Sequence, residues 1–308
     1  MKVCILGNGL TSLSLAKTLV NMGINVEIIL NSNFEKIDKS RTLSISKKNA
    51  SFLNSKVTNI NKLSWKIRNI EIFSENLKNE KVLNFENNQK ELFLIVKNYQ
   101  LMNQLKRELD NNKFLTFKKV LKIKEKELFE NYNLVVNTDP NNFISKKYFY
   151  KKINKDYNSF AYTAIIDHKR FKNNNTAIQI FTKNGPFAFL PISDKQTSLV
   201  YSVRNSEEIN FENFIKKYNN RYSILKINEI SKFELKSSNL RSYYYKNILG
   251  FGDILHKLHP LAGQGFNMTI RDIKLLSYLI KLRIDNGLEI DSSICQEFEK
   301  KIKHKNFL

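Results

Sequence analysis

Apolar residues near the start of the chain change their spacing twice within thirty residues. A short apolar run at residues 2–6 is followed by a stripe over residues 13–20 and by a second run at residues 25–30. Short runs are typical of buried strands, and a stripe that repeats every three to four residues is typical of a helix. The pattern therefore predicts a strand, a turn, a helix and a second strand, the βαβ unit of a parallel sheet.

The middle of the chain has a different pattern, in which strands follow one another without helices between them. Four short apolar runs lie at residues 160–166, 176–181, 187–190 and 198–203. Gly185-Pro186 marks a turn between two of them. Two shorter runs, at residues 70–73 and 81–85, predict a hairpin. Successive strands of this kind predict an antiparallel sheet, separate from the βαβ unit.

The turn of the βαβ unit has the residues that a nucleotide pyrophosphate requires. Gly7 permits a tight turn and Gly9 lets a phosphate approach the backbone at the start of the helix, while Ser12 replaces the third glycine of the usual motif. The acid usually found at the end of the second strand is absent, but Asn31 follows that strand and can hydrogen-bond a ribose hydroxyl. An ordinary glycine turn without a nucleotide is the alternative interpretation.

A second glycine-rich stretch, residues 250–267, lies between a predicted buried strand at 243–251 and a predicted helix. Asp253 follows the strand, where open α/β sheets bind their ligands, and can accept hydrogen bonds from ligand hydroxyls. Gly263 and Gly265 flank Gln264 at the start of the helix, so the backbone N–H groups there are open to a ligand. A solvated loop acid beside an ordinary helix start is the alternative interpretation.

The charge is strongly positive, with 51 Lys and Arg residues against 29 Asp and Glu and a net charge of +22. Such a charge favours phosphate-bearing partners or an anionic membrane surface. The lysines are scattered, however, and no nucleic-acid-binding motif accompanies them, so we do not expect a nucleic-acid function.

Few other chemical features stand out in the sequence. Cys4 and Cys295 lie far apart in the sequence and predict neither a disulfide framework nor a metal site. No nucleophile or catalytic triad is recognisable, and we assign no catalytic residue. A signal peptide and an apolar run of spanning length are both absent, which predicts a cytoplasmic protein, free or attached to the inner face of the membrane.

Several separated stretches resemble one family, the FAD-dependent aromatic hydroxylases of the p-hydroxybenzoate hydroxylase class, and most closely its ubiquinone-biosynthesis branch. The matching stretches are Gly7-Asn8-Gly9, Arg41 to Ser46, Asn98 to Leu105, Phe181 to Pro191, and Gly252-Asp253 with His256, His259-Pro260 and Gly263-Gln264-Gly265-Phe266-Asn267. The last of these is long, gapless and specific, and the resemblance as a whole extends over nearly the whole chain.

The resemblance implies that FAD binds in an extended form. Gly7, Gly9 and Ser12 would lie at the pyrophosphate, Asp253 at the ribityl chain, and the backbone of residues 263–265 at the flavin ring. The remaining residues expected to contact the cofactor are Asn31, Arg41, Asn98, Pro260 and Asn267.

The resemblance also implies an activity, in which a flavin hydroperoxide formed with molecular oxygen hydroxylates the ring of a polyprenylated phenolic precursor of ubiquinone. The family usually has Asp-Gly where this chain has Asp139-Pro140, which leaves the electron donor open between NAD(P)H and another reductant. Membership of a ubiquinone-biosynthesis complex and peripheral contact with the membrane are further expectations. Two alternatives stay open: a divergent flavin oxidoreductase acting on another isoprenoid lipid, and a non-catalytic structural subunit of a quinone-biosynthesis complex.

These observations predict an α/β protein with a Rossmann-like FAD-binding domain and an inserted antiparallel β-sheet substrate domain. We expect the FAD-binding domain to be discontinuous, with residues 1–64, 90–150 and 245–308. The substrate domain would have residues 65–89 and 151–244. A chain of 308 residues has the length of about two domains.

Overall fold

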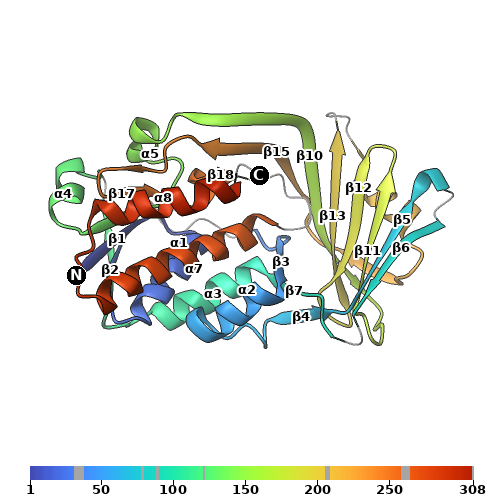
Figure 1. Ribbon diagram of the computed structural model, residues 1–308. Coiled ribbons are helices and arrows are strands. Elements are labelled where there is room, and N and C mark those ends of the chain that lie inside the picture. Colours follow the sequence, from blue (N-terminus) through green and yellow to red (C-terminus); the bar gives the residue numbers. More distant parts are fainter. Residues whose placement is uncertain are drawn as a thin grey trace.

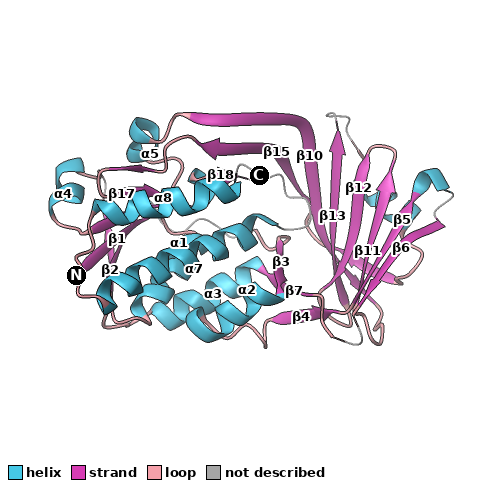
Figure 2. Ribbon diagram, viewed as in Figure 1, coloured by secondary structure: helices cyan, strands magenta, loops and turns pink. Residues whose placement is uncertain are grey.

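The computed structural model describes residues 1–30, 38–77, 80–87, 90–120, 122–204, 209–257 and 264–306. Helices gather around a parallel sheet at one end of the molecule, and a large sheet forms the other end (Figure 2). None of the helices within the described ranges is both long and apolar enough to cross a bilayer.

The parallel sheet contains the predicted βαβ unit. Within the described residues its strand order is β16-β17-β9-β1-β2-β8. The bounds are Lys2–Leu6 for β1, Asn25–Leu30 for β2, Leu115–Lys119 for β8, Leu134–Asn137 for β9, Tyr244–Tyr245 for β16 and Ile248–Gly250 for β17. All neighbours pair in parallel except β16 and β17, which form a hairpin. The single strand predicted over 243–251 was therefore wrong, because residues 246–247 make a turn within it.

Helices lie around this sheet (Figure 1). Their bounds are Leu10–Val20 for α1, Lys47–Phe52 for α2, Asn98–Leu109 for α3, Glu125–Glu130 for α4, Phe143–Tyr148 for α5, Gln264–Asp285 for α7 and Ser292–Asn306 for α8. Short turns of helix lie at Leu53–Val57 (η1), Glu75–Leu77 (η2) and Gly252–Ile254 (η3). The apolar side chains of α7 are fully buried, because the helix packs against α1, β3 and α8; they are Ile270, Ile273, Leu276, Leu279 and Ile280.

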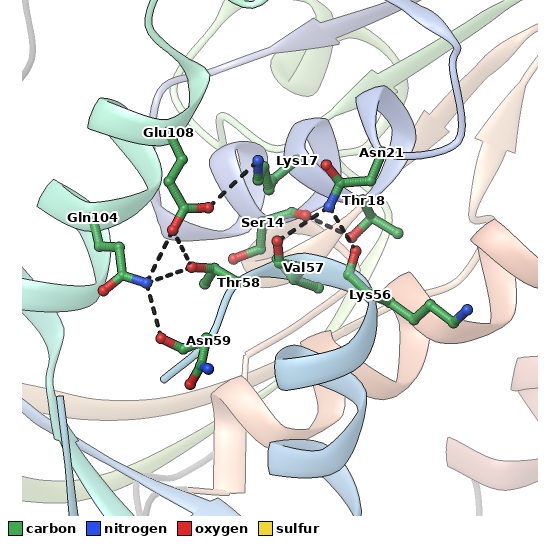
Figure 3. A network of polar contacts seen from close by, with 10 residues as sticks. All are labelled: Ser14, Lys17, Thr18, Asn21, Lys56, Val57, Thr58, Asn59, Gln104 and Glu108. Carbon is green, nitrogen blue, oxygen red and sulfur yellow. Dashed lines mark hydrogen bonds and ion pairs between the residues drawn. The ribbon is translucent and has the colours of Figure 1, made fainter. Parts of the chain in front are cut away.

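A polar network holds α1 beside α3 and the segment that follows η1 (Figure 3). Glu108 of α3 lies 3.4 Å from the ammonium of Lys17 and accepts a 2.6 Å hydrogen bond from the hydroxyl of Thr58. Gln104 donates to Glu108 as well, and Asn21 donates to the carbonyls of Lys56 and Val57 at the end of η1. Lys17 and Glu108 lie in the C-terminal halves of their helices, so these halves of α1 and α3 lie side by side.

The second large sheet has the strand order β18-β15-β10-β13-β12-β11-β5-β6, with β14 paired to β10, among the residues described. The bounds are Asn69–Ser74 for β5, Glu80–Glu86 for β6, Lys152–His168 for β10, Thr176–Thr182 for β11, Gly185–Pro191 for β12, Gln196–Arg204 for β13, Ile224–Ile227 for β14, Ser231–Leu240 for β15 and His256–Lys257 for β18. The predicted strands and the β5–β6 hairpin are confirmed. The prediction of a wholly antiparallel sheet was wrong at one pair, because β5 and β11 start at the same end and pair in parallel.

Strand β10 is much longer than the predicted run at 160–166. Its first half, from Lys152 to Asp156, is polar and mostly exposed, so it lacks the apolar pattern that identifies a strand. It forms because β15 pairs with β10 from Lys152 to Thr163, across an irregularity between Asp156 and Ser159. The strand runs from the large sheet to the parallel one (Figure 1).

A small third sheet, β3-β7-β4 within the described ranges, joins the two large ones. Its bounds are Thr42–Ser46 for β3, Ser64–Ile67 for β4 and Phe93–Lys97 for β7. Hydroxyl pairs connect it to the large sheet: Thr42 with Ser198 at 2.9 Å and Ser40 with Thr163 at 2.9 Å. The hydroxyls of Thr163 and Ser198 therefore lie on the face of the large sheet that is turned toward β3, which we call its inner face.

The domain boundaries given in the sequence analysis stay predictions.

On the other face of that sheet, helix α6 (Phe211–Tyr218) packs on the apolar side chains. Glu75, in η2, ties this helix to the sheet, because its carboxylate accepts hydrogen bonds from the Tyr218 hydroxyl at 2.6 Å and the Lys183 N–H at 2.9 Å. These bonds, together with the smaller effect of Lys217, lower the pKa of Glu75 to about 2.

We predict that Glu75→Gln lowers the free energy of unfolding by about 1 kcal/mol at pH 7, since hydrogen bonds to a charged acceptor are lost. Because the folded pKa is depressed, the stabilisation is present above the ordinary pKa of 4.5 and is lost as the pH falls toward 2. Urea unfolding of both proteins from pH 7 downward measures the difference. Glu86→Gln, at an exposed position on β6, is the control and should show no such trend. A constant difference at every pH would contradict the assignment.

Candidate functional site

The site begins at the carboxyl ends of three neighbouring parallel strands. β1 lies next to β9, and β9 next to β17, so the residues that follow these strands lie at one edge of the sheet. Those residues are Gly7, Thr138 and Gly252, from three distant parts of the sequence. The fold thus brings the two predicted glycine stretches together.

The two glycines of the first turn have different structural roles. Gly7 has φ +117°, and a Cβ on it would lie 2.5 Å from Thr138 Oγ1 and 3.3 Å from the Asp139 backbone nitrogen. Only glycine fits there. Gly9 has ordinary extended backbone geometry, and nothing lies within 4 Å of the position of its Cβ. Gly9 is the N-cap of α1 with no side-chain cap, and the first turn of α1 has no acidic residue, so this helix start is open to an anion.

Ser12 lies inside the structure rather than on the surface. Its hydroxyl is 2.6 Å from that of Thr138, which also donates to the Leu6 carbonyl at 2.9 Å. Ser12 is fully buried, so its small side chain holds α1 close to β1 and β9. The group that Ser12 can offer to a ligand is therefore its backbone N–H, in the first turn of the helix.

The C-terminal stretch reaches the same helix start through Gly252. This residue has φ +62°, and a Cβ on it would lie 2.9 Å from Thr11 Cγ2. The backbone at Gly252 therefore lies against the first turn of α1, and the side chain of the next residue, Asp253, is exposed. Lys152, at the start of β10, lies close enough to Asp253 to interact with its charge; burial and the charge of Lys257 lower the pKa of the Lys152 ammonium, and Asp253 opposes this. Sequence reasoning missed Lys152, since nothing distinguishes it from the many other lysines.

Arg41 and Asn98 lie together at the start of β3 and the start of α3. The Asn98 N–H donates to the Arg41 carbonyl at 3.1 Å. The guanidinium of Arg41 is exposed and lies 5.3 Å from the ring centroid of Phe233 on β15. Arg41 thus lies between the small sheet and the inner face of the large sheet, where it can stack on an aromatic ligand or contact a phosphate.

Asn267 fixes the start of α7 against the end of β3. Its Nδ2 donates to the Ser44 carbonyl at 2.6 Å, and its Oδ1 accepts from the Ser46 N–H at 3.0 Å and from Asn49 Nδ2 at 2.8 Å. This side chain therefore positions the helix. Gly265 follows the first residue of α7, and nothing lies within 4 Å of the position of its Cβ, so the backbone there is accessible.

Four of the predicted residues are described incompletely or not at all. Asn31, Pro260 and Gly263 lie outside the described residues, and Gln264 is described only as the first residue of α7.

Behind the site, β18 is joined to α7 by a buried contact between a histidine and a carboxyl group. His256 Nε2 lies 2.9 Å from Asp272 Oδ2, and both side chains are almost fully buried. Burial raises the pKa of Asp272, while His256 and Arg271 act in the opposite direction. His256 therefore lies in the interior and packs β18 on α7, which favours a structural role for this histidine.

Asp139 has a structural role in this chain. Its carboxylate accepts a 2.9 Å hydrogen bond from the Asn141 N–H, and its carbonyl accepts one from the Ser145 hydroxyl at 2.6 Å. These bonds fix the backbone between the end of β9 and the start of α5, a segment that includes Pro140. No group of three or more metal-ligating side chains occurs among the described residues.

The geometry fits an FAD molecule that extends from α1 to α7. The open N-terminus of α1 suits a pyrophosphate, and the exposed carboxylate of Asp253 beside it suits ribityl hydroxyls. The accessible backbone at Gly265 suits the polar edge of a flavin ring. The cofactor contacts of the individual residues stay predictions.

Comparisons with known proteins agree with this geometry. No protein-family model matches the chain. An alignment 185 positions long covers 46% of this chain and 40% of the human ubiquinone biosynthesis monooxygenase COQ6, mitochondrial, with 26% identity. A stretch covering 42% of the chain is 27% identical to 36% of the 3-demethoxyubiquinol 3-hydroxylase of Escherichia coli. The aligned stretches thus span less than half of the length of these curated relatives.

The similarity of the whole fold extends further than that of the sequence. The crystal structure of pqsL, a probable FAD-dependent monooxygenase from Pseudomonas aeruginosa, superposes with a TM-score of 0.77 over 98% of this chain and 91% of that one, at 14% identity. The chain has the fold of the FAD-dependent monooxygenases. The predicted α/β fold class is confirmed. The predicted resemblance is confirmed too. The chain has this fold, and its sequence relatives are enzymes of ubiquinone biosynthesis.

We predict that Gly7→Ala and Gly9→Ala separate the two roles of the turn in the FAD-free protein. Gly7→Ala should lower the free energy of unfolding by at least about 2 kcal/mol, because its Cβ meets Thr138 and the backbone of Asp139. Gly9→Ala should cost less than about 1 kcal/mol, since its Cβ meets nothing. Denaturant unfolding measures both, and equal losses would contradict the two roles.

Proposed function

We propose that this chain binds FAD and acts as a monooxygenase that hydroxylates the ring of a polyprenylated phenolic precursor of ubiquinone. The main observation in favour is the meeting of Gly9, the open start of α1 and Asp253 at one edge of the parallel sheet. The sequence relatives, which act in ubiquinone biosynthesis, suggest the substrate class.

The cofactor would lie along residues already described. Backbone N–H groups at Gly9 and in the first turn of α1 would bind the pyrophosphate, and Asp253 would accept hydrogen bonds from the ribityl hydroxyls. The start of α7 at Gly265 would approach the ring, with Arg41 and Asn98 at its other side. Bound FAD supplies the redox centre that activates oxygen, and the protein supplies position and a dry environment.

The substrate would bind against the inner face of the large sheet. The register places Thr163, Val200, Ala188 and Gln179 in one row across β10, β13, β12 and β11, and Thr163 is bonded to Ser40 near β3. Val200 and Ala188 give this row an apolar, half-exposed surface suited to a ring and a prenyl chain, and Gln179 can hydrogen-bond a ring hydroxyl.

The remaining parts of the proposal concern partners. Hydroxylation by dioxygen consumes two electrons, so NAD(P)H or another reductant must reduce the flavin. The net charge of +22 and a lipid-tailed substrate favour contact with an anionic membrane surface, on its inner face. A complex of ubiquinone-biosynthesis proteins would be a natural source of such a substrate.

We predict that Gly9→Ala weakens FAD binding at least about 10-fold while the protein stays folded, because the added methyl lies where the pyrophosphate approaches. Asp253→Asn should weaken it about 5- to 10-fold through the loss of charge-assisted hydrogen bonds. Fluorescence titration of FAD into the cofactor-free protein measures both. Asp285→Asn, an exposed acid at the far end of α7, is the control. If both site variants bound FAD as tightly as the wild-type protein, the assignment of the FAD site would be wrong.

We predict that the FAD-loaded protein, given a reductant, incorporates one atom of ¹⁸O from labelled dioxygen into the ring of a polyprenylphenol. Mass spectrometry of the product measures the label, and flavin-loaded protein without reductant is the control. Reduction of an isoprenoid without incorporation of oxygen would favour the oxidoreductase alternative. Protein that takes up no FAD would favour the structural-subunit alternative.

A further inference from the structure

A cleft of about 90 Å³ lies on the large sheet at the end of α6. Its floor is apolar and comes from Ile178 and Ile180 of β11 and Phe189 of β12. Its rim comes from the end of α6 and the loop after it, and includes Lys217 and Arg221. The cleft therefore combines an apolar floor with two cationic side chains.

This cleft lies on the opposite face of the sheet from the proposed flavin site. Ile178, Ile180 and Phe189 belong to the core that α6 covers. Side chains alternate along a strand, so Gln179, between the two isoleucines, lies on the other face, in the row of Thr163 that is turned toward β3. A ligand in the cleft would thus bind beside FAD and substrate rather than in their place.

Arg221 presents a donor that the protein does not use. Among the described residues, its Nε is buried and has no hydrogen-bond partner. Its guanidinium lies 4.8 Å from the ring centroid of Phe171, which holds the planar group in place. A buried donor without an acceptor is unfavourable by about 1–3 kcal/mol. An acceptor oxygen in the cleft would remove this cost.

The charges at the rim of the cleft favour a hydrogen-bond acceptor that is itself negatively charged. Lys217 lies 3.1 Å from the carboxylate of Glu75, which also accepts from the Tyr218 hydroxyl. The pKa of Glu75 is lowered to about 2, so this carboxylate is charged at neutral pH and neutralises Lys217. Among the described residues that line the cleft, one positive charge is left, on Arg221, next to an apolar floor.

The wall that carries Arg221 is held in place by hydrogen bonds. Asn219 and Tyr222 exchange two of them, from Asn219 Nδ2 to the Tyr222 carbonyl at 2.7 Å and from the Tyr222 N–H to Asn219 Oδ1 at 3.0 Å. The Tyr222 hydroxyl donates to Asn174 Oδ1 at 2.9 Å, and the Asn174 carbonyl accepts from Trp65. The cleft is therefore formed before a ligand arrives, which reduces the entropy lost on binding.

We propose that this cleft is a second ligand site, which binds small carboxylates with an apolar body of about the size of benzoate. The ring or short chain packs on Ile178, Ile180 and Phe189, and the carboxylate accepts a hydrogen bond from Arg221 Nε. The site is separate from the proposed FAD and substrate sites and does not depend on the proposed activity.

Titration calorimetry of benzoate into the full-length, FAD-loaded protein tests the proposal, with neutral benzyl alcohol as the comparison ligand. Benzoate should bind at least about 10-fold more tightly than benzyl alcohol, and Arg221→Gln should weaken benzoate about 10-fold. Arg170→Gln is the matched control, because Arg170 lies outside the cleft in an exposed pair with Asp194. The fluorescence of Trp65, the single tryptophan, reports binding nearby, and the flavin absorption should stay unchanged.

A second variant keeps the test decisive if Arg221→Gln is unstable. Ile180→Phe leaves Arg221 in place and fills the floor of the cleft, so it should also abolish benzoate binding. No measurable binding to the wild-type protein would overturn the proposal. Equal affinity in Arg221→Gln, or binding that changes the flavin spectrum, would overturn it too, since the ligand would then lie elsewhere. FAD content is measured on the same samples, so a failure of the flavin assignment is recognised separately.

Discussion

The close approach of three chain segments at the start of α1 is the constraint on which the rest of the site depends. The segments follow β1, β9 and β17, and they meet because these strands are parallel neighbours. The approach is possible only without a side chain at Gly7, where a Cβ would meet Thr138, and at Gly252, where a Cβ would meet Thr11. Two residues with positive φ thus bring Asp253 to an open helix N-terminus.

Other contacts extend this arrangement toward the large sheet. Asn267 binds the end of β3, so the start of α7 has a fixed position relative to the small sheet. The small sheet in turn is joined to the inner face of the large sheet through the hydroxyls of Ser40 and Thr42. An elongated cofactor between α1 and α7 would therefore lie between rigid elements, which favours precise placement of its ring relative to a substrate on the sheet.

The sequence predicted the parts of the fold that have strong local patterns. Strands β1 and β2 were predicted with the bounds that the structure shows, because buried parallel strands have continuous apolar runs. The polar halves of strands were not predictable in this way. β8 contributes the partly exposed segment Leu115–Lys119, and the first half of β10 is polar, so each is a strand only because of its neighbour. The parallel pairing of β5 with β11 depends on contacts distant in sequence.

The same distinction holds for the site. Gly7, Gly9 and Asp253 could be predicted because each has a local reason, namely a turn, a helix start or a strand end. The burial of Ser12 against Thr138, the clamp made by Asn267 and the position of Lys152 beside Asp253 could not, since each depends on a partner far away in the chain. Even the motif histidine His256 proved to be an interior residue, paired with Asp272 of α7.

The most direct test of the central claim is the visible absorption spectrum of the purified protein, with the released chromophore identified and counted against the polypeptide. If the glycine turn, Asp253 and the start of α7 form one cofactor site, the protein holds one FAD per chain, or takes one up when FAD is added. A colourless protein that binds no added FAD would contradict the account.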